Sequence, residues 1–347
     1  MSNSGFMLRR FSSVFASWSV MQRALCGLST NHDIGKIHGL PVVYHPLYSA
    51  PQLKPGHRFP MDKFRTIYDI LLKQGTVQEH QVVQPPSIAS DEQILQVHTK
   101  EYVESFSNCT LDDKQVRRIG FGDATRTNAL VERTKAEVAG TLLTAEIALR
   151  TGLACNLAGG THHAFPEYGS GYCIINDLAV TAKILLNTGL ANRILILDLD
   201  VHQGDGTASI FSNEPRVFCI SVHCESNFPA RKQQSDLDIG LPDGMQDEEY
   251  LKVIAGFLPD RLRSFQPDIV LYDAGVDPHK DDPLGRLCLT NEGLMRREMM
   301  VMDCCLSAGI PLANFTGGGY DDNVNLVAQR HCFMVEAATQ MWKDHKL

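Results

Sequence analysis

Three carboxylates and a histidine stand close together between Asp198 and Gly206, in the stretch DLDVHQGDG. The apolar run at 193–197 directly before them is typical of a fully buried strand. Charged groups beside such a strand are costly unless they are paired or bind a metal ion. Because Asp200 and His202 are two residues apart, they leave an extended backbone on the same face and suit a cation such as zinc. A polar loop that merely caps the next helix would need one aspartate, not three.

Three further loops carry unusual polar residues, and each follows an apolar run. His162 and His163 come after a Gly-Gly pair, Asp277 follows the run at 268–272, and Tyr320 ends a Thr-Gly-Gly-Gly-Tyr loop. Taken singly, they could be a surface histidine pair, a turn aspartate and an exposed tyrosine. In open parallel sheets, however, the loops beyond the carboxyl ends of the strands form one crevice. We therefore expect these groups to converge on a single site.

The elements that would position these loops alternate between apolar and amphipathic runs. Buried strands are predicted at 153–158, 193–197, 216–222, 268–272 and 310–315. Helices are predicted at 61–74, 129–150, 176–187, 247–265 with an interruption at Pro259, and 292–307. Such alternation implies a parallel sheet that is covered by helices on both faces. The sequence therefore predicts a single α/β domain.

Composition narrows the classes of protein. The chain has 347 residues, 44% of them hydrophobic, which suits one large core. The net charge of −8 argues against direct binding of nucleic acid and leaves cationic substrates open. No stretch is apolar enough for a membrane span. The ten cysteines are scattered without a CxxC pair, which predicts reduced thiols in an intracellular protein. The oligomeric state is left open.

The first 38 residues differ in composition from the rest. They are rich in arginine and serine and contain no acidic residue before Asp33. This composition is typical of an organelle transit peptide, whereas a disordered tail with later starts at Met7 or Met21 explains it equally well. We expect residues 1–38 to be a leader, either a mitochondrial transit peptide or a disordered tail. The location would be mitochondrial in the first case and cytoplasmic or nuclear in the second.

The polar loops, taken in order, resemble the zinc-dependent histone deacetylase and acetylpolyamine amidohydrolase superfamily. The shared motifs are tandem histidines after Gly-Gly, Asp-x-Asp-x-His-x-Gly-Asp-Gly, Gly-x-Asp before Asp-Pro-Leu-Gly, and Gly-Gly-Gly-Tyr. The segments 56–61 and 169–177 also match, and the first favours class IV-like members. The resemblance runs from about Leu40 to the last helix. It implies the arginase/deacetylase fold, an eight-stranded parallel sheet flanked by helices, with a zinc deacetylase catalytic domain at 39–347.

The resemblance also implies two sites for cations. Asp200, His202 and Asp277 would bind one zinc ion and leave positions for water and the substrate carbonyl. Asp198 and Ser221 match positions around a structural monovalent cation, usually potassium.

Catalytic roles follow from the same resemblance. His163 would be the general base and later the acid, with Asp205 as its carboxylate partner, and His162 would be the electrostatic partner, paired with Asp198. Tyr320 would donate its hydroxyl to the developing oxyanion, and the glycines before it would let it swing in.

The expected substrate is an acylated lysine of a protein or peptide, held in a narrow tunnel. Gly171, Tyr172 and Phe228 match the tunnel walls, and Arg58 matches an arginine that lines an exit channel for the released acid. Leu284 stands where polyamine-preferring members carry an acidic residue, so acetyl-lysine or a longer acyl-lysine is favoured over acetylated polyamines. The chain is thus expected to be a protein lysine deacetylase.

Other functions remain open at this point. One is hydrolysis of acetylpolyamines or other small amides. Another is a two-manganese hydrolase of the arginase kind, which would leave the tandem histidines and the Gly-Gly-Gly-Tyr loop without a role. A third is a non-catalytic scaffold that binds acyl-lysine, which would predict the loss of a ligand, of His163 or of Tyr320, and none is lost.

Overall fold

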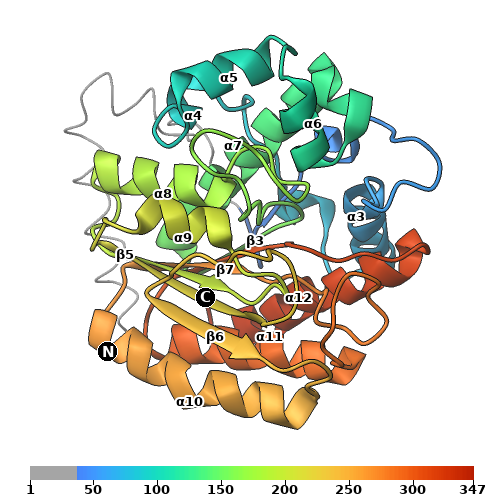
Figure 1. Cartoon of the computed structure of the whole chain (residues 1–347). Helices are drawn as coiled ribbons and strands as arrows, with labels where there is room; N and C mark the ends of the chain where they lie inside the picture. Colours follow the sequence, from blue (N-terminus) through green and yellow to red (C-terminus); the bar gives the residue numbers. More distant parts are fainter. Residues whose placement is uncertain (1–36) are drawn as a thin grey trace.

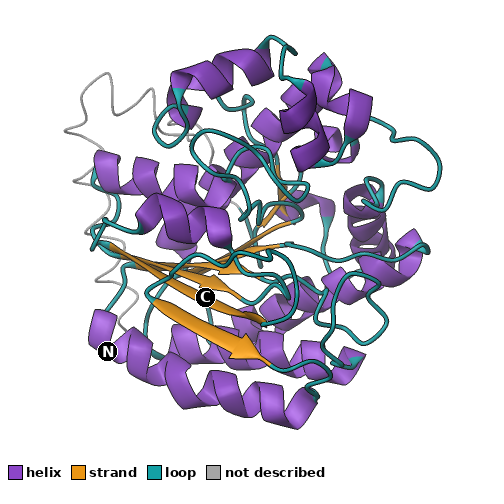
Figure 2. Ribbon diagram, viewed as in Figure 1, coloured by secondary structure: helices purple, strands orange, loops and turns teal. Residues whose placement is uncertain are grey.

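The five apolar runs of the sequence form the centre of one sheet. The computed structural model describes residues 37–347 and contains eight parallel strands in the order β2-β1-β3-β8-β7-β4-β5-β6 (Figure 2). The central strands are β3 (Leu153–Asn156), β8 (Leu312–Phe315), β7 (Ile269–Asp273), β4 (Ile194–Asp198) and β5 (Val217–Cys224). Every residue of β3, β4, β7 and β8 is buried, as expected for strands covered on both faces. The predicted eight-stranded α/β fold is confirmed.

The outer strands were not predicted from the sequence. β1 (Val42–Val43) and β2 (Val82–Val83) have two residues each and extend one edge. β6 (Leu237–Leu241) forms the other edge, and its residues alternate between partly buried and exposed before the buried Leu241. Two residues give no periodic signal, and β6 interrupts its apolar pattern with an aspartate and a glycine.

Helices cover both faces of the sheet (Figure 1). On one face lie α7 (Asn128–Thr151), α8 (Asp177–Thr188) and α9 (Asp205–Phe211). On the other lie α3 (Lys63–Gln74), α10 (Asp247–Phe265), α11 (Asn291–Ser307) and α12 (Val324–Asp344). The short helices α4 (Asp91–Ile94), α5 (Lys100–Ser107) and α6 (Asp113–Ile119) lie beyond α7, and single 3-10 turns occur at Pro46–Ser49, Glu79–Gln81 and Gly122–Arg126. The predicted helices are all present.

The expected interruption at Pro259 is wrong, because α10 runs unbroken from Asp247 to Phe265 with the proline inside it. Pro259 is exposed, as is Ala255 four residues earlier. A backbone carbonyl that loses its helical partner at an exposed position can bond to water, so the helix continues at limited cost.

Two further expectations concern the chain as a whole. Every cysteine within the described residues is a free thiol, in agreement with the prediction of reduced thiols, and Cys155, Cys173 and Cys219 are buried. Within 37–347, none of the helices combines the length and the apolar character that a membrane crossing requires. Residues 1–36, and with them nearly all of the expected leader, lie outside the described part of the chain.

Candidate active site

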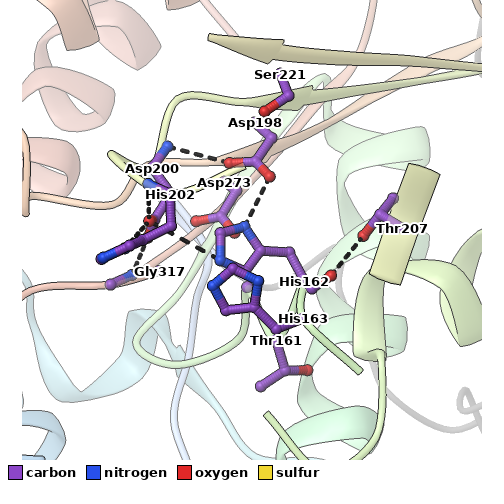
Figure 3. A network of polar contacts seen from close by, with 12 residues as sticks. Thr161, His162, His163, Asp198, Asp200, His202, Thr207, Ser221, Asp273 and Gly317 are labelled. Carbon is purple, nitrogen blue, oxygen red and sulfur yellow. Dashed lines mark hydrogen bonds and ion pairs between the residues drawn. The ribbon is translucent and has the colours of Figure 1, made fainter. Parts of the chain in front are cut away.

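The loops after β3, β4, β7 and β8 meet beyond the carboxyl ends of these central strands, as the strand pattern predicted (Figure 3). They bring the tandem histidines, the Asp-x-Asp-x-His stretch, Asp277 and Tyr320 together. All of these side chains are buried, and Tyr320, with 7% exposure, is among the most accessible. The predicted convergence is therefore observed.

Asp200, His202 and Asp277 offer three ligand atoms that lie within 4.8 Å of one another. His202 Nδ1 is 2.9 Å from an oxygen of Asp200 and 3.2 Å from one of Asp277. The second oxygen of each carboxylate accepts a backbone N–H, that of Gly318 at 2.9 Å for Asp200 and that of Val201 at 2.8 Å for Asp277. The backbone thus fixes both carboxylates in the orientation in which they converge.

The same cluster attracts positive charge. Burial disfavours the charged form of His202, but hydrogen bonds to Asp200 and Asp277 outweigh it and raise the pKa of His202 to about 10. Burial, together with the charge of Asp200, raises the pKa of Asp277 to about 6. Carboxylates and imidazoles bind a metal ion in their deprotonated form. A divalent cation bound to this cluster would therefore replace the proton that the cluster attracts. The donor set of two carboxylates and one imidazole fits zinc.

Each of the tandem histidines has its own carboxylate. His162 Nδ1 lies 2.7 Å from Asp198 Oδ2, and His163 Nδ1 lies 2.7 Å from Asp205 Oδ1. Burial opposes a charge on His162, but Asp198 and its acidic neighbours raise its pKa well above the usual value. Burial and the positive charge on His162 lower the pKa of His163 to about 4. The pKa values of the two imidazoles, whose ring centroids are 4.1 Å apart, are therefore shifted in opposite directions.

The histidine loop is held by Asp177, the first residue of α8. Its carboxylate accepts the backbone N–H groups of Gly160 at 3.1 Å and Thr161 at 2.8 Å. On the far side, the carbonyl of His162 accepts the N–H of Thr207 in α9, at 3.1 Å, and also the Thr207 hydroxyl, at 3.4 Å (Figure 3). The start of one helix and the first turns of another therefore position the two imidazoles.

The glycine-rich loop before Tyr320 is tied down at several points. Gly318 donates its N–H to Asp200, and its carbonyl accepts the N–H of Val276 at 2.7 Å. The N–H of Tyr320 donates to Asp282 Oδ2 at 2.7 Å. The expectation that the glycines let Tyr320 swing in stays a prediction. They permit close approach, because a Cβ on Gly318 would lie 2.2 Å from Asp200 Oδ2.

Gly171 and Phe228, the residues expected to wall the tunnel, both lie beside His163. The ring of Phe228 stands edge-on to that of His163, with centroids 4.9 Å apart, and Phe228 is 45% exposed. A Cβ on Gly171 would be 2.7 Å from the His163 ring and 3.2 Å from the Phe228 ring, so only glycine fits between them. Leu284 is partly buried near this wall, and its carbonyl accepts the side-chain N–H of Asn227 at 2.6 Å.

Tyr172 takes a different position, on the side of Tyr320. Its ring lies 5.9 Å from that of Tyr320 and 5.4 Å from that of Phe59, between centroids. Its φ of 65° follows a φ of 53° at Gly171, and the two N–H groups donate to the carbonyls of Ile119 and Arg118 at the end of α6. The turn that presents Tyr172 to the site is thus anchored by α6.

Arg58 does not line the cavity beside the histidines. It is exposed at the surface, and the arginine that lines the cavity is Arg133 of α7. Arg133 is 2% exposed and makes two hydrogen bonds to Glu137, at 2.7 and 2.9 Å. This paired carboxylate allows the guanidinium to be buried. The expectation of an interior position for Arg58 does not agree with its exposure, and Arg133 is the arginine beside the histidines.

Ser221 lies opposite Asp198 in the register of β5 and β4. Its hydroxyl is 3.0 Å from His223 Nδ1, and one oxygen of Asp198 accepts the N–H of Asp200 at 3.1 Å. The two residues expected around a monovalent cation are therefore neighbours in the sheet.

Some supporting residues were not singled out from the sequence. Asp177 lies in the matching segment 169–177 and Asp282 in the DPLG motif, so their place in these motifs could have identified them as candidate site residues. Asp273 ends β7, and Lys63 contacts the loop before Tyr320 from α3. The Lys63 contact spans 254 positions, so no local pattern could reveal it.

Comparisons with known proteins agree with this geometry. A family model described as the histone deacetylase domain matches residues 57–335. An uncharacterized protein of Picosynechococcus is 51% identical over 304 residues, which cover 88% of this chain and all of that protein. Histone deacetylase 2 of Arabidopsis thaliana is 29% identical, over 80% of this chain and 74% of its own. The crystal structure of the HDA15 HD domain has a TM-score of 0.72 at 21% identity, covers 89% of this chain and 93% of its own, and supports the fold.

Proposed function

This chain belongs to the histone deacetylase family, and we propose that it is a zinc-dependent hydrolase that removes acetyl groups from the ε-amine of lysine in proteins or peptides. The observation that carries the proposal is the pair of adjacent histidines with separate carboxylate partners and opposite pKa shifts, beside a cluster of three metal ligands. Amide hydrolysis is accelerated by a neutral base near the scissile bond and by groups that stabilise the negative charge that develops on the carbonyl oxygen.

Asp200, His202 and Asp277 would hold the zinc ion. When bound, zinc would polarise the amide carbonyl and lower the pKa of a water molecule. The other cluster of metal-binding side chains among the described residues is His162, Asp198 and Asp273. The two clusters have no ligand in common, whereas the metals of a two-metal site lie about 4 Å apart and act as one clamp. This supports one zinc per chain over the two-manganese alternative.

His163 would move the protons. A pKa of about 4 leaves its ring neutral at pH 7. With Nδ1 held by Asp205, Nε2 is free to accept a proton from the attacking water and later to give it to the leaving lysine amine. His162, which is kept charged by Asp198, would stabilise the negative charge that develops in the transition state.

Tyr320 would donate its hydroxyl to the developing oxyanion. Burial raises the pKa of Tyr320 well above its usual value, and the acidic side chains of Asp200 and Asp277 raise it further. The phenol therefore remains protonated and able to donate throughout the working pH range. One such donor contributes about 100- to 1,000-fold to the rate of comparable acyl-transfer enzymes.

The substrate class is argued from the wall and the rim of the site. Phe228 and Gly171 bound a narrow passage beside His163 that suits the apolar stem of a lysine. Leu284 brings no charge to the rim for the distal ammonium of a polyamine. We therefore propose an acylated lysine as substrate, with acetylated polyamines as the alternative.

The space inside the site favours a short acyl group. The cavity, which is lined by the two histidines, Gly171 and Tyr320, is narrow: the region in which the centre of a water-sized group can lie measures about 30 Å³. An acetyl group fits such a space, whereas a long acyl chain would require the walls to move.

A panel of substrates tests this proposal. Zinc-loaded protein should release acetate from an acetyl-lysine peptide faster than it cleaves a long-chain acyl-lysine peptide or acetylspermidine. His163→Ala should lower kcat by about 100- to 10,000-fold while the zinc content stays at one per chain. If the zinc-loaded protein binds the peptide but releases no acid, the chain is a binding scaffold. Two manganese ions per chain would instead favour the arginase-like alternative.

We also propose a structural monovalent cation and an N-terminal leader. The pairing of Asp198 with Ser221 supports a structural monovalent cation, which a change in thermal stability between potassium and a large organic cation would test. The composition of residues 1–38 supports a leader, and a fluorescent fusion with and without this segment would decide between a mitochondrial and a cytoplasmic or nuclear location.

A further inference from the structure

Lys63, the first residue of α3, is buried without a carboxylate partner. Its side chain is 1% exposed, and no ion pair joins it to an acidic residue within the described part of the chain. Burial lowers its pKa to about 8, against the attraction of Asp277 and Asp200. A buried ammonium is costly unless other groups compensate. Its position must therefore be explained by what it contacts.

The ammonium of Lys63 forms hydrogen bonds to the backbone of the loop that precedes Tyr320. Nζ donates to the carbonyl of Gly317 at 3.1 Å and to that of Gly319 at 3.3 Å. It also lies over three aromatic rings, 5.3 Å from the centroid of Phe64, 5.5 Å from that of Phe59 and 5.8 Å from that of Tyr320. Ring faces attract a cation, so they replace part of its lost hydration.

These contacts complete the set of restraints on the loop. The N–H groups of Gly318 and Tyr320 are held by Asp200 and Asp282, while the carbonyls on either side of Gly318 are held by Lys63. Without the lysine, the partly buried carbonyl of Gly317 and the buried carbonyl of Gly319 would lose this donor, which is unfavourable for groups shielded from water. The glycines could then relax toward other backbone conformations, because glycine has many available.

We propose that Lys63 is a positioning residue that holds Tyr320 in place for catalysis by fixing the Gly317–Gly319 backbone. The inference rests on the proposed function, in which the Tyr320 hydroxyl stabilises the oxyanion. Because the ammonium donates to the backbone of the loop, Lys63 acts on the reaction through the tyrosine and not on the substrate itself. A purely structural lysine would support the fold without any special relation to Tyr320.

A double-mutant cycle distinguishes the two roles. Lys63→Met should lower kcat for an acetyl-lysine peptide by about 100-fold, the loss that a misplaced catalytic group produces, and should change KM much less. In a Tyr320→Phe background the same substitution should cost less than about 3-fold, because the hydroxyl to be positioned is gone. Lys73→Met, at the exposed end of the same helix, is the matched control and should leave kcat unchanged. Equal losses in both backgrounds, or no loss, would overturn the proposal.

Amide hydrogen exchange gives a readout that does not depend on activity. In Lys63→Met the N–H groups of Gly318 and Tyr320 should exchange about tenfold faster, while those of the central strands keep their protection. Unchanged exchange at the loop would contradict the proposal. If the wild type releases no acetate, the proposed function fails, yet the exchange result still decides whether Lys63 holds the loop. Should Lys63→Met not fold, Lys63→Gln, whose amide can donate to one carbonyl, takes its place in the same comparisons.

Discussion

Asp273 lies directly beside Asp198 in the register of β7 and β4, and neither of its carboxylate oxygens has a hydrogen-bond partner within the described residues. Asp273 is fully buried, and its nearest basic atom, His162 Nδ1, is 3.9 Å away. Burial, and then the charge of Asp198, raises the pKa of Asp273 well above its usual value. The carboxyl therefore stays protonated more readily in the folded chain than in the unfolded one.

Asp273→Asn is expected to stabilise the protein. An acid with a raised pKa in the folded state contributes most stability at low pH and loses it as pH rises above the unfolded value of 3.8. An amide is neutral at every pH, so the gain in Tm should be about 2–4 °C at pH 7 and smaller near pH 4. Thermal unfolding at both pH values checks this. A lower Tm at pH 7 would mean that the charged carboxylate is needed, for example to bind a cation with Asp198.

Asp205→Asn is expected to remove activity without removing the metal. Asp205 holds His163 with the proton on Nδ1, which leaves Nε2 as the base. An asparagine amide can donate to Nδ1 instead and so place the proton on Nε2, where it blocks the base. A loss of about 1,000- to 10,000-fold in kcat is expected, since the wrong tautomer costs that much in related catalytic triads. Zinc content should remain one per chain. Near-normal kcat would show that Asp205 does not set the tautomer.

Lys232→Met is expected to weaken substrate binding more than it slows the chemical step. Lys232 Nζ donates to the carbonyls of Glu225, Asn227 and Pro229, at 3.0, 2.7 and 2.8 Å, and so closes the loop around Phe228. These bonds explain how the segment PARKQQ at 229–234, which contains no glycine, keeps its shape.

Without these bonds the wall at Phe228 should loosen, and KM for an acetyl-lysine peptide should rise about tenfold, which corresponds to about 1.4 kcal/mol. Steady-state kinetics measure it, with the exposed Lys252→Met on α10 as a matched control. A fall in kcat with KM unchanged would assign Lys232 to the chemistry rather than to the wall.

Local pattern was sufficient to predict the centre of the fold. β4 and β7 are unbroken apolar runs because helices bury both of their faces, so their sequences carry a strong signal. β1 and β2 are strands only because neighbouring strands pair with them, and two residues leave no pattern to read. β6 lies at the open edge, where one face is exposed and polar residues are tolerated.

The residues of the site also fall into those that a local motif predicts and those that only tertiary packing places there. His162, His163 and Asp200 were predicted because each lies within a short motif whose residues act together. Lys63 could not be predicted, because its role depends on α3 packing beside a loop far along the chain. Which arginine is buried beside the histidines also depends on tertiary structure. The sequence motif indicated Arg58, whereas the buried arginine is Arg133, which pairs with the carboxylate of Glu137.

Glu214→Gln is expected to lower stability near neutral pH but not in acid. Glu214 joins α8 to the start of β5, with its carboxylate 3.0 Å from Lys183 and 2.7 Å from Arg216. The Arg216 hydrogen bond, helped by Lys183 against the effect of burial, lowers the pKa of Glu214 to about 2. A lowered pKa contributes stability that is fully present above the unfolded value of 4.5 and is lost as pH falls toward 2.

The variant should therefore melt about 2–4 °C below the wild type at pH 7, and the difference should shrink at pH 4 and shrink again at pH 3. Thermal unfolding by circular dichroism at these three pH values measures it. Glu132→Gln, an exposed position on α7, is the control and should leave Tm unchanged. A Tm difference that stays constant with pH would trace the loss to packing, because only a charge-dependent contribution disappears when the carboxylate is protonated.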